Sequence, residues 1–491
     1  MRNYILGRVV RSIIAILVVV SIALVILYNM IPRSKIFEND PVLQKVKGDD
    51  AVVYKYNKWQ ELGYLDFKQA KDFCAESDNK QACMITGSKE QKQALTKFEE
   101  QGYVVINLSD NTPIIYRDYN SFEIVGRFYR DFLKIDTPNV VVDESNPNLE
   151  RKYYVESGAN GIPALKCSGC EYQYQLYVDG SFPFIHQNML RLNFGKSYPT
   201  NQGVDTLEVI STGQGKAKLE KQTFPTGSTS KSAINQYTCR YKQSSTLDHL
   251  DTGKFTTNYA NCGLNYDSPS MIGTSYLFGI VALILAYAIA LPAGILMARK
   301  KDKWQDKVGV VYINFLIAVP SLAFIFIMKL IGMVFGLPDK FPQFGFKDGR
   351  SYILPMIILA LLSTSAIMTW VRRYMVDQSN ADYVKFAKAK GLSNKDIFNK
   401  HILKNAIIPI VNGIPASVVL CISGAVMTES VFAIPGMGKM LPDSIKALNN
   451  NMVITLTFIF TALSIFSLLL GDILMTMVDP RIQLTSKGET R

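Results

Sequence analysis

Six long stretches of the chain are almost entirely apolar, and they constrain the fold more than any other feature of the sequence. A helix needs about 20 apolar residues to cross the hydrocarbon core, because every backbone amide inside lipid must bond within its own segment. The sequence therefore predicts an all-α polytopic membrane protein with six transmembrane helices. The predicted crossings are Ile13–Ile31, Ile272–Ala298, Val308–Gly336, Tyr352–Val371, Ala406–Met427 and Met452–Met477.

The first stretch could instead be a cleaved signal peptide, since three arginines precede it. Its apolar core is longer than a usual signal core, and no small-x-small cleavage site follows before Pro32. We therefore interpret it as a signal-anchor helix.

The orientation follows from the positions of lysine and arginine, because short positively charged loops stay in the cytoplasm. With the N-terminus inside, the cytoplasmic pieces hold 19 Lys and Arg against 7 Asp and Glu, whereas residues 33–270 hold 28 against 29. The net charge of +12 thus belongs to these loops and argues for topology rather than for nucleic-acid binding. The cytoplasmic pieces are 1–12, 299–307, 372–405 and 479–491.

This pattern divides the chain into four parts. An N-terminal transmembrane helix (1–32) precedes an extracytoplasmic α+β domain (33–270), which is inserted between helices 1 and 2. A five-helix core (271–482) and a cytoplasmic tail (483–491) follow. Within the inserted domain, residues 40–105 have helical spacing.

The chain after Val104 is rich in β-branched and aromatic residues, which is typical of strands. The predicted strands include "YVVINL", "PIIYRDY", "NVVVDE" and "RKYYVE".

Six of the seven cysteines lie in the predicted outside domain, and Cys421 lies in the fifth crossing. An oxidising exterior permits three disulfides, with 15 connectivities left open by the sequence. Four of the thiolates could instead bind zinc: Cys167, Cys170, Cys239 and Cys262. The candidate disulfide cysteines are Cys74, Cys83, Cys167, Cys170, Cys239 and Cys262.

The predicted loop after the fourth crossing encodes two short helices. In the first, Tyr383, Phe386, Ala387 and Lys390 share a face by their spacing, and this face opposes Lys385 and Lys388. Gly391 suits the left-handed cap that ends a helix, and Ser393 with Asp396 forms a variant capping box that starts the second helix.

The strings "DYVKFAKAKGLS" and "HILKNAIIPIV" in this loop resemble the cytoplasmic loop of binding-protein-dependent ABC importer permeases, in the oligopeptide, dipeptide and nickel branch. The general family signature opens Glu-Ala-Ala, where this chain has Lys385-Phe386-Ala387, a departure usual in the peptide branch. The segments "ESVFAIPGMGKM" (429–440) and "DPRI" (479–482) are similar to the same branch. The large insertion resembles the enlarged form of this subunit in some Gram-positive peptide importers.

The resemblance implies that the loop 372–405 couples the permease to ATPases, with Gly391 as a hinge. It also implies a homologous second permease forming a heterodimer, two cytoplasmic ABC ATPases and an extracellular lipid-anchored binding protein. The implied cargo is an oligopeptide, with dipeptides or nickel as alternatives. The residues implied in coupling are Asp382, Tyr383, Phe386, Ala387, Ala389, Lys390, Gly391, Ser393, His401, Asn405 and Pro409.

The chain offers no ATP site or catalytic set of its own. Gly195-Lys196-Ser197 resembles the end of a phosphate-binding loop, but Leu190 stands where that loop requires glycine. We therefore expect a multi-pass cell-membrane transport subunit without enzymatic activity, cofactor or metal. A secondary transporter or a membrane receptor would be the alternative of a different class.

Polar residues inside the predicted crossings are candidates for a peptide pathway, although such residues also form helix–helix contacts. The charged Lys329 and Asp472 lie within predicted membrane segments, which makes them candidates for a function. Both are near a predicted helix end, so they could instead reach the interface by snorkelling. The candidate pathway residues are Ser363, Thr364, Ser365, Thr369, Asn412 and Ser417.

Overall fold

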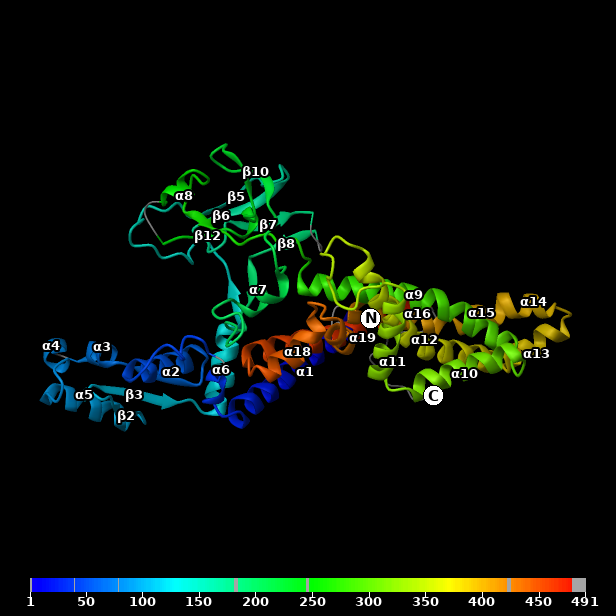
Figure 1. The fold of residues 1–491 in the computed structure, drawn as a ribbon, viewed down its shortest axis with the longest axis horizontal. Coiled ribbons are helices and arrows are strands. Elements are labelled where there is room, and N and C mark those ends of the chain that lie inside the picture. Colours follow the sequence, from blue (N-terminus) through cyan, green and yellow to red (C-terminus); the bar gives the residue numbers. More distant parts are fainter. Residues whose placement is uncertain are drawn as a thin grey trace.

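The computed structural model describes residues 2–478 except 39, 78, 181–183, 244–246 and 422–424. Four of its helices are long and apolar enough to cross a membrane. They pack as neighbours, α9 on α12 and α1 on α19. Figure 1 shows α9, α10, α12 and α16 together at one end of an elongated molecule. The four helices are α1 (Arg2–Met30), α9 (Met271–Arg299), α12 (Arg350–Ser379) and α19 (Asn450–Val478).

The predicted crossing 308–336 is not one helix. It divides into α10 (Trp304–Ala318) and α11 (Ser321–Val334), which meet at an angle of 108°. The break falls at Pro320, which lacks an N–H and pushes Val319 into an extended conformation with ψ of 126°. Pro320 was visible in the sequence, and its effect on the backbone outweighs the helix prediction from the apolar run.

The predicted crossing 406–427 is also segmented. Helix α15 (Leu403–Ala406) bends by 42° into α16 (Ile408–Leu420), which packs along α19. Two further helices precede α19: α17 (Val426–Phe432) and α18 (Met437–Lys446). The "DPRI" segment lies outside the described residues.

Between α1 and α9 the chain forms two lobes, visible at the opposite end of the molecule in Figure 1. The first lobe (residues 33–132) contains a three-stranded antiparallel sheet in the order β1-β3-β2. The sequence predicts that residues 65–68 are helical. They instead form β1, which pairs with β3. The elements are α2 (Asp49–Glu61), β1 (Leu65–Lys68), α3 (Ala70–Phe73), α4 (Lys80–Cys83), α5 (Lys89–Glu100), β2 (Val104–Asn107), β3 (Pro113–Asp118) and α6 (Ser121–Phe132).

The second lobe (residues 133–270) centres on a four-stranded antiparallel sheet in the order β5-β6-β7-β8. Three two-stranded pairs surround it: β4 with β9, β10 with β11 and β12 with β13. The elements are β4 (Leu133–Ile135), β5 (Lys152–Ser157), β6 (Pro163–Ser168), β7 (Tyr174–Val178), β8 (Ile185–Gln187), β9 (Leu190–Leu192), α7 (Thr206–Ser211), β10 (Glu220–Thr223), β11 (Thr229–Ser232), β12 (Arg240–Tyr241), α8 (His249–Thr252) and β13 (Tyr259–Asn261).

The predicted strand "NVVVDE" is wrong, because residues 139–144 form turns. The Arg151 side chain donates to the carbonyls of Pro138 and Val141, at 2.8 Å in both cases. These carbonyls are therefore satisfied without a neighbouring strand.

The six cysteines of the lobes form three disulfides, Cys74–Cys83, Cys167–Cys170 and Cys239–Cys262. All four thiols of the alternative zinc site are thus bonded to one another in pairs. The zinc interpretation is wrong for this structure.

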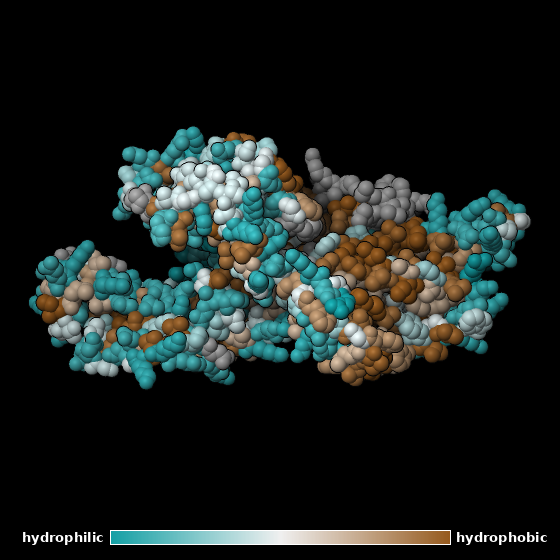
Figure 2. Space-filling model, turned by 45° about the horizontal axis from the view of Figure 1, so that its top comes forward, coloured by the Kyte–Doolittle hydropathy of each residue, from teal (hydrophilic) through white to brown (hydrophobic). Residues whose placement is uncertain are grey.

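The surface divides the molecule in a similar way. Figure 2 shows a broad hydrophobic band over the helical half, with hydrophilic surface over the lobes and at the far end that carries α13 and α14 in Figure 1. Exposed apolar side chains of the helices contribute to this band, including Ile284, Val311 and Ile331. This distribution is typical of a protein whose helical part is embedded in lipid.

Candidate functional site: the coupling segment and the joint with the lobes

The segment after α12 begins with the short helix α13 (Asp382–Ala389), which is followed by the C-cap residue Lys390 and by Gly391. Gly391 has φ of +80°, and the Leu392 N–H donates back to the Ala387 carbonyl at 3.2 Å. A residue with a side chain would be strained in this left-handed conformation. The glycine therefore fixes where α13 stops and how the chain leaves it.

Ser393 starts the next helical stretch, as its side chain accepts the Asp396 N–H at 3.1 Å. Helix α14 (Asn394–Asp396) continues into a π-helical turn (Ile397–Ile402) and then into α15. A single apolar cluster holds the whole segment against α12. It consists of Val371, Met375, Val384, Ala387, Ile397, Ile402 and Ala406.

The burial pattern of α13 differs from the contact face predicted from the sequence. Ala387 is 7% exposed and packs inside this cluster rather than at the surface. Tyr383 is half-buried, and its hydroxyl donates to Gln378 at the end of α12 at 2.8 Å. Phe386, by contrast, is 71% exposed. Among the exposed residues of this segment, Asp382, Phe386 and Ala389 of α13 and the following Lys390 form what we call the outer face.

The other predicted coupling residues are spread along the segment. Gly391, Ser393, Asn405 and Pro409 are exposed, and His401 is half-buried. Pro409 stands in the first turn of α16, where its missing N–H costs no helical hydrogen bond. The four exposed residues are therefore accessible to a partner.

An ion pair that the sequence analysis missed braces the start of the segment. Arg372 of α12 donates to both carboxylate oxygens of Asp306 in α10, at 2.6 and 2.8 Å. Asp306 is 2% exposed and also accepts the Asp302 N–H at 3.0 Å. Two parallel bonds of this kind fix relative orientation as well as distance. The pair therefore ties the end of α12 to α10.

Three successive asparagines at the start of α19 form a joint with the lobes. The Asn449 amide donates to Ser197 and Thr200 at 2.8 and 2.9 Å, and its oxygen accepts the Met452 N–H in the first turn of α19. Asn450 donates to the Tyr64 hydroxyl at 2.7 Å, and Asn451 to the Lys196 carbonyl at 2.9 Å. The first lobe, the second lobe and α19 thus meet at three consecutive residues.

Close packing supports these hydrogen bonds. Gly195 has φ of +85°, and a Cβ there would lie 2.7 Å from the Asn451 amide nitrogen, so this position requires glycine. Next to it, Phe458 of α19 contacts Phe132 and Phe194 with ring centroids 5.4 and 5.1 Å apart. The joint is therefore a packed interface and not a flexible linker.

A buried carboxylate on the first lobe extends the joint. Asp40 accepts hydrogen bonds from the hydroxyls of Tyr54 and Tyr198 and from the Val42 N–H. Burial opposes ionisation of Asp40, but these hydrogen bonds outweigh it and lower the pKa of the carboxyl group. Asp40 therefore fixes Tyr198, whose backbone N–H faces Asn449.

The candidate pathway residues differ in burial and in hydrogen bonding. Thr364 is buried and shares a 2.7 Å hydrogen bond with Tyr312 of α10, so it serves a helix–helix contact. Ser365 is buried as well, whereas Ser363 and Thr369 are exposed on α12. Asn412 and Ser417 are half-buried on α16, and the Ser417 hydroxyl donates to the Gly413 carbonyl of its own helix.

The two intramembrane charges are both engaged. Lys329 of α11 donates to the Val431 carbonyl at 3.1 Å and lies over the Phe432 ring. Asp472 of α19 pairs with Arg8 of α1. Each charge therefore joins two segments that are distant in sequence.

Sequence comparisons place these features in context. The profile of the family described as "Binding-protein-dependent transport system inner membrane component" matches residues 290–484. The oligopeptide transport system permease protein AmiC of Streptococcus pneumoniae is 41% identical, over 99% of this chain and 100% of its own length.

Shorter relatives align with about half of the chain. The dipeptide transport system permease protein DppB of Lactococcus lactis is 32% identical over 48% of this chain and 78% of its own length. The oligopeptide transport system permease protein AppB of Bacillus subtilis is 29% identical over the same shares.

Proposed function

Because the chain belongs to the permease family of binding-protein-dependent ABC importers, we propose that it moves oligopeptides into the cell as one half of the membrane pathway. The full-length relative from S. pneumoniae is named as an oligopeptide permease, which favours oligopeptides over dipeptides or nickel. In this family the permease is a transport subunit, and separate subunits hydrolyse ATP. The receptor and secondary-transporter alternatives therefore fall away.

The observation that carries the coupling proposal is the build of the segment 382–406. Its inner side is packed on α12, its end is fixed by Gly391, and its outer face presents the exposed Phe386 beside charged residues. A lever between two rigid bodies needs a fixed base and an accessible contact. The outer face of α13 is the contact for the ATPase, and the apolar cluster is the base.

The partners follow from the same role. A homologous second permease would complete a heterodimer and cover the exposed Ser363 and Thr369 of α12. Two cytoplasmic ABC ATPases would engage the two permeases, and an extracellular lipid-anchored binding protein would deliver the peptide.

Uptake tests this function. Cells lacking the chain should fail to accumulate a labelled oligopeptide in an ATP-dependent manner, and restoring the chain should recover uptake. Competition by dipeptides or by nickel at equal concentration distinguishes the alternative cargoes. Normal oligopeptide uptake without the chain would contradict the proposal.

We propose six crossings, counting each bent helix pair as one, with residues 33–270 outside the cell and both termini in the cytoplasm. The loop charges and the hydrophobic band of Figure 2 support this topology. We predict that an impermeant thiol reagent modifies Glu150→Cys in intact cells and spares Lys303→Cys. Both positions are exposed in the structure, so a difference in labelling reports the side of the membrane on which each lies. The reverse labelling pattern would invert the topology.

We also propose that the lobes receive the binding protein and pass its docking to α19 through the joint. Asn449→Ala should remove four hydrogen bonds of Asn449, at about 1 kcal/mol each, and loosen the joint. Hydrogen exchange of residues 196–204 should accelerate, and uptake should fall while ATPases remain bound. Asn107→Ala, at an exposed position of the first lobe, is the control. Unchanged exchange and uptake in Asn449→Ala would contradict this role of the joint.

A further inference from the structure

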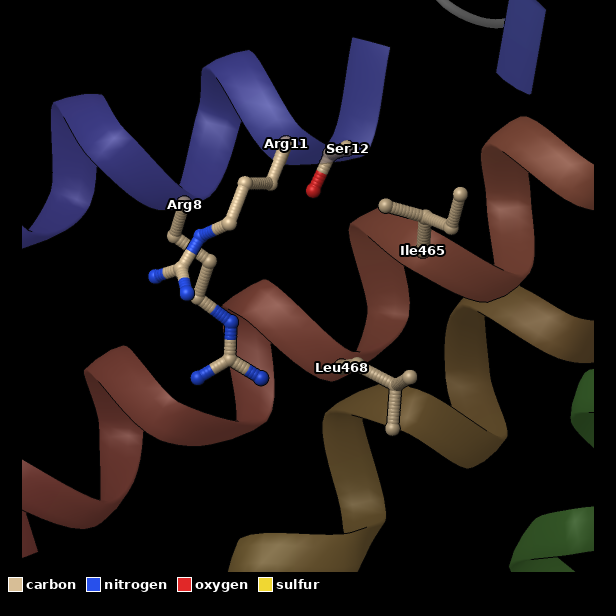
Figure 3. Close-up of a pocket in the computed structure, with 5 residues that line it drawn as sticks. All are labelled: Arg8, Arg11, Ser12, Ile465 and Leu468. Carbon is tan, nitrogen blue, oxygen red and sulfur yellow. The ribbon is translucent and has the colours of Figure 1, made fainter. Parts of the chain in front are cut away.

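A cavity of about 440 Å³ lies between α1 and α19, lined by two arginines, a serine and two aliphatic residues. Figure 3 shows the side chains of Arg8 and Arg11 extending from α1 toward α19, with Ser12 on the same side. Ile465 and Leu468 face them from α19. The cavity is therefore basic on one wall and apolar on the other.

The cavity is linked through α19 to α16, the helix that follows the coupling segment. Asp472, the partner of Arg8, follows Gly471, where a Cβ would lie 3.5 Å from the Asn412 carbonyl oxygen. Asn412 is in the second turn of α16, which directly follows the coupling segment. In the proposed topology, the N-terminal part of α1, which carries the two arginines, meets the cytoplasmic leaflet.

The polar wall of the cavity is basic. Arg8, which pairs with Asp472, and Arg11 both line it, and the lining residues include no carboxylate. Arg11 donates its Nε to the Gly7 carbonyl of its own helix at 3.2 Å, which leaves its terminal nitrogens for another acceptor. Within the described part of the chain, no carboxylate forms an ion pair with Arg11. Arg11 therefore offers a guanidinium group for an anion, on a helix that is long and apolar enough to span a membrane.

The surroundings favour a lipid over a free anion. Ile13 and Ile14 on α1 and Leu468 on α19 are 52%, 54% and 60% exposed, so apolar surface continues away from the arginines. An acyl chain can cover such surface, whereas inorganic phosphate cannot. Basic pockets between helices at the cytoplasmic side are suited to anionic headgroups.

We propose that this cavity binds the phosphate of an anionic phospholipid headgroup through Arg11, with Arg8 shared between that phosphate and Asp472. The guanidinium of Arg11 can form two parallel bonds to a phosphate. The lipid then holds α1 against α19 beside α16, the helix that follows the coupling segment.

Lipid binding to the purified full-length chain in detergent tests the site, by native mass spectrometry with added phosphatidylglycerol, phosphatidylcholine or inorganic phosphate. The wild type should retain phosphatidylglycerol in preference to phosphatidylcholine. Arg11→Gln should weaken retention about tenfold, as expected for one lost charge-assisted contact. Asp472→Asn should strengthen it, because a negative charge beside the bound phosphate is then removed.

Lys301→Gln is the matched control, since it removes one positive charge from an exposed loop on the proposed cytoplasmic side and should leave retention unchanged. Equal retention of phosphatidylglycerol by the wild type and Arg11→Gln would overturn the proposal. Binding of inorganic phosphate as strong as that of the lipid would also overturn it, because the site would then recognise a free anion.

Discussion

Ala387→Glu should abolish peptide uptake, because it places a carboxylate inside the cluster that fastens the coupling segment to α12. Ala387 is 7% exposed among apolar side chains that include Met375 and Ile402. An unpaired buried charge costs several kcal/mol, which exceeds what one small helix can offset. The segment should detach from α12 and become sensitive to protease between residues 382 and 406, as limited proteolysis of the purified chain can measure.

Ala389→Glu is the matched control for Ala387→Glu, with the same substitution two residues along the same helix. Ala389 is exposed on the outer face, so its carboxylate remains in water and the segment should stay protease-resistant. Gly391→Val should have an intermediate effect. No atom lies within 4 Å of the added Cβ, but the left-handed backbone costs about 1–2 kcal/mol. Equal protease resistance in Ala387→Glu and the wild type would contradict the packing of this segment.

Arg372→Ala should destabilise the permease core by about 3 kcal/mol and lower uptake, because it leaves the Asp306 carboxylate buried without its partner. Removing one member of a buried pair costs more than the pair contributes, since the other charge loses its compensation. The partial exposure of Arg372, 28% of its side chain, places the effect at the lower end of the range for buried pairs. Thermal unfolding of the purified chain measures the loss.

Arg373→Ala supplies the comparison for Arg372→Ala, because the neighbouring arginine is exposed and stacks on Trp370. Its removal should change stability little. The double variant Arg372→Gln with Asp306→Asn should recover most of the loss, because no charge is then left buried. Equal thermal stability of Arg372→Ala and Arg373→Ala would contradict a bracing role for the ion pair.

The local signals in the sequence were the most dependable. The apolar runs predicted where the long helices lie, because the requirement for internal hydrogen bonding in lipid acts on each segment separately. Gly391 and Ser393 indicated the end of one short helix and the start of the next, since caps are decided by neighbouring backbone groups. The break at Pro320 could have been predicted in the same way and was hidden only by the hydrophobicity around it.

Features that depend on distant partners were not predictable from local pattern. Tyr383, Phe386 and Ala387 share a face by spacing, but packing against α12 divides them between the inside and the surface. Asp306 and Arg372 are 66 positions apart, and Asn449 and Ser197 are 252 positions apart. Nothing near these residues in sequence indicates the partner. The capping role of Asn449, by contrast, has a local signal in the apolar helix that follows it.

The central claim is that the outer face of α13 contacts the ATPase, and cross-linking in the intact complex tests it most directly. A short cross-linker from Phe386→Cys should capture the ATPase subunit, whereas Val384→Cys, which is 3% exposed and faces α12, should not. The expected result is a product at position 386 whose yield changes when ATP is added. The absence of any product at 386 while the ATPases remain bound, or equal products at 386 and 384, would contradict the claim.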